Sequence, residues 1–242
     1  MIIEKLNWDT EFFGIKVGRI ILAETDNFDP VSFEQQVKED EFELVYIISL
    51  KKILNIENKE QLKLNLMDVQ ITMSKKFNPN EYSNIPYEFR TELSETELQE
   101  CYRIAEQTAT VSRFYKEPLI GPEKTKELYR KWIDNALDQS FSDGLFVERT
   151  KNTIVGVHII KTNNTNKLGL FTLTGVDENI KRMGLGSKLW NQSFGYWSNT
   201  CELECINSPF SLQNMESFNF HLKMGFNKLE EIKYIYHYSN KL

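Results

Sequence analysis

Two glycines stand where a predicted strand, residues 169–176, gives way to a predicted helix, in the segment Met183-Gly184-Leu185-Gly186-Ser187. The first amides of a helix have no partner within it, and the helix dipole adds positive partial charge at the same end. Glycines in this place let phosphate oxygens approach the backbone. The segment therefore predicts a phosphate-binding loop, to which Lys181 and Arg182 would add positive charge.

The loop departs from two common nucleotide-binding patterns. A dinucleotide-binding loop needs a third glycine in G-x-G-x-x-G, and a P-loop needs G-K-S/T after four residues. Neither pattern is present between residues 176 and 187. A tight turn before a helix remains the other interpretation of Gly184 and Gly186.

A second pattern follows 30 to 40 residues later, with Asn214, Ser217, His221, Gly225 and Phe226 at fixed spacing. A helix that ends at a glycine explains the last two residues but not the first three. The pattern resembles Asn-x-x-Ala/Ser-x-x-x-Tyr/His-x-x-x-Gly-Phe of the GNAT superfamily of N-acetyltransferases. The glycine loop is similar to that family's Arg/Gln-x-x-Gly-x-Gly/Ala motif, with a lysine in the first position.

The resemblance implies acetyl-CoA as co-substrate, with its pyrophosphate on the glycine loop, and direct attack by an amine without an enzyme nucleophile. His221 occupies the position where many members carry a tyrosine that protonates the departing sulfur. A histidine suits proton exchange near neutral pH, although packing on a helix over 212–224 is the alternative. The cofactor-binding residues implied are Val176, Lys181, Arg182, Met183, Gly184, Leu185, Gly186, Ser187 and Asn214.

Two chemical roles are left open by the sequence. The oxyanion would be met by a backbone N–H of strand 170–176, with no particular amide indicated. The general base has several candidates, and His158 in the apolar run VGVHII is also expected as a core residue. The candidates are Glu106, Tyr115, Glu148 and His158.

The first ninety residues exceed what such a transferase domain needs. Their opening, Leu6–Gly14, and the later segment Ser112–Tyr115 resemble the dTDP-fucosamine acetyltransferases. That resemblance implies a small-molecule amine on a nucleotide-activated amino sugar as acceptor, and a possible homodimer. The substrate-binding residues implied are Arg113, Tyr115, Trp8, Phe12 and Phe13. A structural arginine and an aromatic core strand are the other interpretations of these residues.

Other acceptors and another class of protein also remain open. The alternatives are a GNAT enzyme for a different small amine or acyl group, a transferase for protein N-termini, and a non-catalytic acyl-CoA-binding module. A proton donor at His221 would separate an enzyme from a binding module, which needs only the phosphate loop.

The helices and strands that must position these residues are predicted from hydrophobic periodicity and from residues that start or end elements. Ser94-Glu95-Thr96-Glu97 is a capping box that opens a helix, and a second helix begins near Pro122. Strands are predicted at 15–22, 43–50, 66–73, 145–149, 153–161, 169–176, 201–207 and 230–237, and further helices at 31–39, after 186, and at 212–224. The pattern indicates an α/β protein: residues 1–85 as a small α/β domain, then a GNAT domain at 86–242 with a mixed, mostly antiparallel sheet flanked by helices.

Composition excludes several classes of function. A net charge of -6 argues against nucleic acid and anionic membrane as partners. The charged N-terminus is unlike a secretory signal, and no apolar run is long enough to span a membrane. Three cysteines without a CxxC pattern fit the cytoplasm, and three histidines argue against a metal site.

Overall fold

The computed structural model describes residues 2–55, 62–180 and 183–240. Its described strands form a ten-stranded sheet in the order β1-β2-β3-β10-β4-β9-β8-β7-β6-β5. The strands are β1 (Glu4–Lys5), β2 (Val17–Leu22), β3 (Leu44–Leu50), β4 (Leu64–Lys76), β5 (Phe89–Arg90), β6 (Gly144–Thr150), β7 (Thr153–Asn163), β8 (Leu168–Val176), β9 (Cys205–Ser211) and β10 (Lys228–Ser239). The helices are α1 (Asn7–Phe13), α2 (Pro30–Glu39), α3 (Glu95–Ala109), α4 (Arg113–Lys116), α5 (Gly121–Leu137), α6 (Leu185–Thr200) and α7 (Met215–Lys223), with short 3-10 turns at Pro79–Glu81 and Glu178–Ile180.

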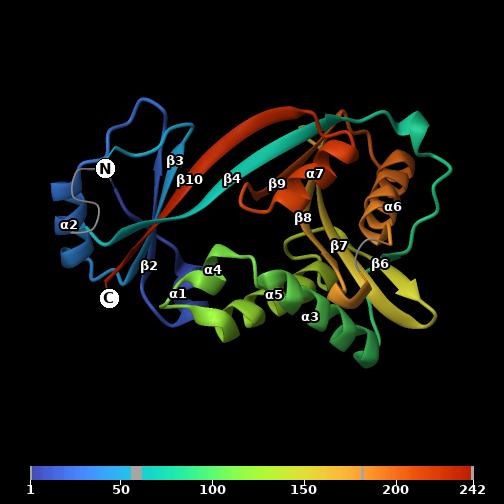
Figure 1. Cartoon of the computed structure of the whole chain (residues 1–242), viewed down its shortest axis with the longest axis horizontal. Helices are drawn as coiled ribbons and strands as arrows, with labels where there is room; N and C mark the ends of the chain where they lie inside the picture. Colours follow the sequence, from blue (N-terminus) through green and yellow to red (C-terminus); the bar gives the residue numbers. More distant parts are fainter. Residues whose placement is uncertain (1, 56–61, 181–182, 241–242) are drawn as a thin grey trace.

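The two long strands β4 and β10 run across the molecule and join its two ends (Figure 1). At one end, β2 and β3 pack with α2 through a core that contains Phe33 and Ile47. At the other end, α6 covers the sheet with Trp190 and Phe194. Helices α1, α3, α4 and α5 gather along one side of the molecule (Figure 1). The sheet is mostly antiparallel, as the sequence predicts, with parallel pairing only between β2 and β3 and between β8 and β9 among the described strands.

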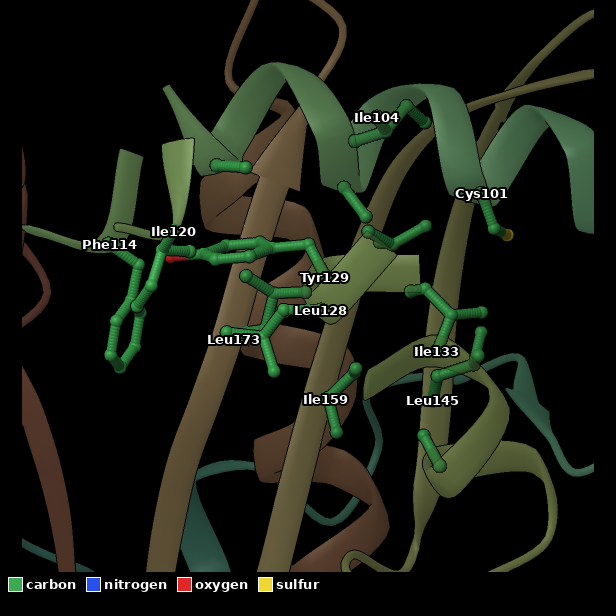
Figure 2. Close-up of a cluster of buried hydrophobic side chains, with 14 of the residues drawn as sticks. Cys101, Ile104, Phe114, Ile120, Leu128, Tyr129, Ile133, Leu145, Ile159 and Leu173 are labelled. Atoms are coloured by element: carbon green, nitrogen blue, oxygen red, sulfur yellow. The ribbon is translucent and has the colours of Figure 1, made fainter. Parts of the chain in front are cut away.

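The core beneath α3 and α5 is continuous with the strands that carry the site. Figure 2 shows Ile104 of α3 and Ile133 of α5 pointing toward Leu145, Ile159 and Leu173. The ring of Tyr129 extends from α5 toward Ile120 and Phe114 (Figure 2). Burial of each such aliphatic side chain stabilises the fold by roughly 1.5–3 kcal/mol. Phe114 belongs to this core, which therefore fixes α4, the short helix that follows α3 and precedes α5 in the chain.

Most predicted elements are confirmed, because their signals are local. Ser94 caps α3 with the reciprocal hydrogen bonds of a capping box. The hairpin of β6 and β7 turns at Lys151, which has a left-handed φ of 59°. Helix α2 begins at an Asp29 cap with Pro30 next to it. The family fold expected from the two motifs is therefore the observed one in its order of helices and strands.

Two predicted strand features are wrong. The strand predicted at 201–207 lies four residues later, at Cys205–Ser211, because α6 continues to Thr200 and Cys201 caps it. Long-range pairing with β4, from Lys76↔Cys205 to Gln70↔Ser211, sets that register. Cys201 and Cys205 are consequently not on one strand, and both are half-buried. The aromatic opening forms the helix α1 and not a core strand.

The predicted boundary at residue 85 falls between β4 and β5, within a segment that packs on α6. The Ile85 carbonyl oxygen lies 2.4 Å from where a Cβ on Gly195 would stand, so this approach requires glycine. The sheet is continuous across the boundary, since β10 from the C-terminal part lies between β3 and β4. The division into domains 1–85 and 86–242 stays a prediction. None of the described helices combines the length and the apolar character that a membrane crossing requires.

Candidate active site

The predicted phosphate loop connects β8 to α6. Gly184 is the residue before the helix and has a left-handed φ of 76°, which favours glycine. The N–H of Lys188 donates to the Gly184 carbonyl at 3.1 Å and begins the helical ladder. The amides of Leu185, Gly186 and Ser187 therefore have no partner within the helix and can meet an anion. Lys181 and Arg182 lie outside the described residues.

Helix α3 holds the start of this loop in place. The Asp177 carboxylate accepts from Nη1 of Arg103 at 2.5 Å, and from the N–H and Nδ2 of Asn179 at 3.0 Å each. Oε1 of Gln107 accepts from the N–H of Glu178 at 3.2 Å. Burial raises the pKa of Asp177, but these donors outweigh it and keep the pKa below its usual value. A charged Asp177 thus anchors the loop to α3.

Strands β8 and β9 part beside the loop. Their parallel pairing covers only Leu168↔Cys205, Gly169↔Ile206 and Leu170↔Asn207. Beyond these pairs β9 stays with β4, while β8 continues with β7 to Val176. After Leu170, the edge of β8 on the side of β9 therefore has no ladder pairs with β9. Backbone N–H groups on such an edge could polarise a carbonyl bound between the strands.

Helix α7 lies against the first turn of α6. A Cβ on Gly186 would stand 3.3 Å from the ring of Phe220. Asn214 caps α7 by accepting from the N–H of Ser217 at 3.0 Å, so a contact with cofactor would come from its Nδ2. Met183 is exposed and Leu185 is buried, whereas Val176 and Ser187 are half-buried. The structure brings together these described residues of the two sequence motifs.

His221 is enclosed on the opposite face of α7 from solvent. Its Nδ1 lies 2.7 Å from the Ser217 carbonyl and its Nε2 lies 2.7 Å from Oγ of Ser208. The ring stacks on Phe210 with centroids 3.8 Å apart. Burial lowers the pKa of His221 to about 4, so the ring is neutral at pH 7. Both ring nitrogens thus have partners within the protein. The role of His221 as proton donor stays a prediction.

Replacing His221 with phenylalanine should flatten the acid limb of stability. Below pH 6.5 the unfolded chain protonates this histidine while the folded chain does not, so the free energy of unfolding falls as pH drops from 6.5 toward 4. The loss amounts to up to about 3 kcal/mol at 1.36 kcal/mol per pKa unit. Urea unfolding at several pH values measures it. His158, whose pKa burial lowers to about 3, has the same sign and remains in the variant.

The same variant decides the catalytic role of His221. A general acid contributes about 10²–10⁴-fold to turnover, so kcat should fall by at least about 100-fold if the prediction holds. An unchanged kcat together with the flattened stability profile would leave His221 a packing residue.

The aromatic residues of α1 and the residues of α4 lie together, although a hundred positions separate them. The rings of Phe13 and Phe114 have centroids 5.9 Å apart. Trp8 stacks on Phe12 at 4.8 Å and is 47 % exposed. Nζ of Lys124 lies 4.8 Å above the Phe12 ring. Trp8, Phe12 and Phe13, which the sequence predicts to bind substrate, therefore meet Phe114 of α4 and Lys124 of α5 at one surface.

Arg113 joins that surface to the sheet. Its guanidinium carbon lies 4.1 Å from the ring centroid of Phe114 and 5.6 Å from that of Tyr46. Burial raises the pKa of Asp9, and the Arg113 charge and the Tyr46 hydroxyl oppose this shift. Tyr115, the last predicted substrate residue, is half-buried on α4.

Most candidates for the general base already pair with other side chains of the protein. Glu106 pairs with Arg130, and Glu148 accepts from Nε2 of Gln192 at 2.8 Å. His158 is fully buried, with Nδ1 at 2.9 Å from Oγ1 of Thr174. It is therefore a core histidine, one of the two interpretations of the sequence. Among the described residues no group of three or more His, Cys, Asp or Glu side chains is placed to hold a metal ion.

Two pairs of interacting side chains are not predicted by the sequence. One is the Arg103–Asp177 anchor, and the other is a buried pair of Glu117 and His237 joined at 2.7 Å. The partners are 74 and 120 positions apart, so no local pattern connects them. A glutamate in the short segment between two predicted helices is the only local signal, and it is a weak one.

Comparisons with known proteins fit this fold and loop. A family model described as Acetyltransferase (GNAT) family matches residues 98–226, which is more than half of the chain. The chain therefore belongs to the GNAT acetyltransferase family. It is an acetyltransferase, and acetyl-CoA is the acetyl donor that this family uses. A search of curated proteins finds no significant sequence match.

Solved structures share the fold at low identity. A conserved protein of Staphylococcus epidermidis of unknown function is 10% identical with a TM-score of 0.61, over 93% of this chain and 84% of that one. A GCN5-related N-acetyltransferase of Sphaerobacter thermophilus is 11% identical with a TM-score of 0.54, over 86% of this chain and 66% of that one. A GCN5-related N-acetyltransferase of Kribbella flavida is 11% identical with a TM-score of 0.52, over 93% of this chain and 82% of that one. Coverage of 93% means that the likeness includes the N-terminal strands.

Proposed function

We propose that this acetyltransferase acts on the amine of a small molecule, and that the molecule is a nucleotide-linked amino sugar of the dTDP-4-amino-4,6-dideoxyhexose type. The observation that supports this acceptor is the meeting of Leu6–Gly14 with Ser112–Tyr115. These are the segments that resemble the dTDP-fucosamine acetyltransferases, and Phe13 contacts Phe114 where they join.

The chemistry of that surface suits a nucleotide sugar. The exposed, stacked pair of Trp8 and Phe12 offers a flat aromatic face on which a base can stack. Lys124 beside Phe12 adds a positive charge for a diphosphate. Arg113 lies deeper, next to Asp9, where its fork of donors can reach a phosphate or the sugar.

The donor side uses the amides at the start of α6. Acetyl-CoA supplies the activated acetyl group as a thioester. The amides of Leu185, Gly186 and Ser187, together with the helix dipole, would hold its pyrophosphate. The acetyl end would lie where β8 leaves β9, so that a β8 amide stabilises the oxyanion. An amine that has lost its proton attacks the carbonyl directly, and the CoA thiolate leaves.

Thiol release from acetyl-CoA, with and without dTDP-4-amino-4,6-dideoxygalactose, tests the proposal. We expect release that depends on the sugar and is well above background. A peptide with a free N-terminus is the matched control acceptor. Release with the peptide alone would replace the sugar by a protein substrate. No release with either, while acetyl-CoA still raises the Tm, would favour a binding module.

A further inference from the structure

Three buried polar atoms meet around the ring of Tyr46. Nε2 of His237 and Nε of Arg113 have no hydrogen-bond partner within the part of the chain that the structure describes, and the Tyr46 hydroxyl has only the Asp9 carboxylate beside it. The His237 ring lies 4.9 Å and the Arg113 guanidinium carbon 5.6 Å from the Tyr46 ring. Buried polar groups are almost always paired in folded proteins. Two unpaired buried nitrogens, from β10 and α4, on either side of the Tyr46 ring of β3 call for a ligand that the chain does not supply.

Glu117 determines which nitrogen of the His237 imidazole carries the proton. Its Oε2 lies 2.7 Å from Nδ1 of His237, and its Oε1 accepts from Oγ of Ser239 at 2.8 Å. Burial lowers the pKa of His237 against the pull of Glu117, so the ring is neutral. A neutral ring that donates from Nδ1 to a carboxylate presents a bare Nε2 lone pair. His237 is therefore a fixed hydrogen-bond acceptor.

A ligand group that pairs with all three side chains must both donate and accept hydrogen bonds. Nε2 of His237 accepts, Nε–H of Arg113 donates, and the Tyr46 hydroxyl does either. An ammonium group could only donate, and a phosphate could only accept. An alcohol hydroxyl satisfies both. The rings of Tyr46, Phe114 and Phe13 add apolar faces beside it.

We propose that Tyr46, His237 and Arg113 form a hydroxyl-recognition subsite for the sugar of the acceptor, with Glu117 as a positioning residue. The inference rests on the proposed function, which it narrows to a sugar with a free hydroxyl near the amine. Asp9 and Arg113 are half-buried, and they mark the side from which the hydroxyl reaches the buried Tyr46 and His237. Lys116, at the end of α4, reaches Gln213 beyond β9 at 3.1 Å, so α4 links this subsite to the site of the acetyl group.

Tyr46→Phe tests the subsite, because it removes the hydroxyl and keeps the ring. With the amino sugar as varied substrate we expect kcat/KM to fall about 3- to 10-fold, mainly through KM, as for loss of one neutral hydrogen bond. The KM for acetyl-CoA should not change. Tyr236→Phe is the matched control, because its hydroxyl accepts from the N–H of Leu54 at 3.1 Å in the core on the other sheet face. That control should lower the Tm and leave both KM values unchanged.

A deoxy analogue of the acceptor completes the experiment. Wild type should use it less well than the parent sugar, and Tyr46→Phe should not weaken it further. Equal KM values for wild type and Tyr46→Phe with the parent sugar would overturn the subsite and leave the proposed function standing. A wild-type enzyme that does not turn over the amino sugar would overturn the proposed function, and the subsite with it.

Discussion

Replacing Ser187 with glutamate should weaken acetyl-CoA binding by about 10- to 100-fold while leaving the fold at least as stable. Ser187 is the third residue of α6, in the turn that we propose to bind the pyrophosphate of acetyl-CoA. A carboxylate there complements the helix dipole, which stabilises a helix by about 0.3–1 kcal/mol. The same carboxylate repels a pyrophosphate some 5 Å away by about 2–3 kcal/mol at an effective dielectric constant of 20–40. Calorimetric titration with CoA and urea unfolding measure the two effects.

Opposite signs for binding and stability make this variant decisive. Ser187→Gln has nearly the same shape without the charge, so its CoA affinity should stay within a few-fold of wild type. Salt should restore part of the lost affinity in Ser187→Glu, because screening weakens exposed charge interactions. Equal CoA affinity of the glutamate and glutamine variants would move the pyrophosphate away from the start of α6.

Predictability of the fold follows the range of the interactions. Helix α3 is specified by four consecutive residues, Ser94–Glu97, whose hydrogen bonds all close within one turn. Strand β9 depends on β4, more than a hundred positions away, and its predicted place is four residues early. Residues 201–204, Cys-Glu-Leu-Glu, alternate apolar and charged side chains as a strand does, and only the tertiary pairing with β4 places the strand after them.

The candidate site divides in the same way. Gly184 and Gly186 can be found in the sequence because strand, turn and helix are contiguous, and the turn needs a left-handed residue at Gly184. Asp177 reads as one more polar loop residue until Arg103 is seen beside it. His221 shows a further limit, since the motif gives its position but not its burial beside Phe210. A motif locates a side chain, and only packing determines its pKa.

Glu117 and His237 carry the largest stability effect that the structure predicts. Both side chains are 1% exposed, and Glu117 accepts from His237, from Ser239 and from the N–H of Leu119. Burial raises the pKa of Glu117, but these donors outweigh it, so the buried carboxylate is charged. Glu117→Ala removes the charge and leaves its donors unpaired. We expect a loss of about 3–5 kcal/mol in the free energy of unfolding, measured in urea.

Two further variants separate the buried pair from a general effect of losing a glutamate. Glu123 on α5 is 82% exposed and pairs with Lys126, so Glu123→Ala should change stability by less than about 0.5 kcal/mol. Glu117→Leu combined with His237→Leu removes donor and acceptor together, and should be less destabilised than Glu117→Ala. A loss below about 1 kcal/mol in Glu117→Ala would mean that the pair is not buried in solution. Since Glu117 directly follows α4, that result would also remove the support that holds Arg113 over Tyr46.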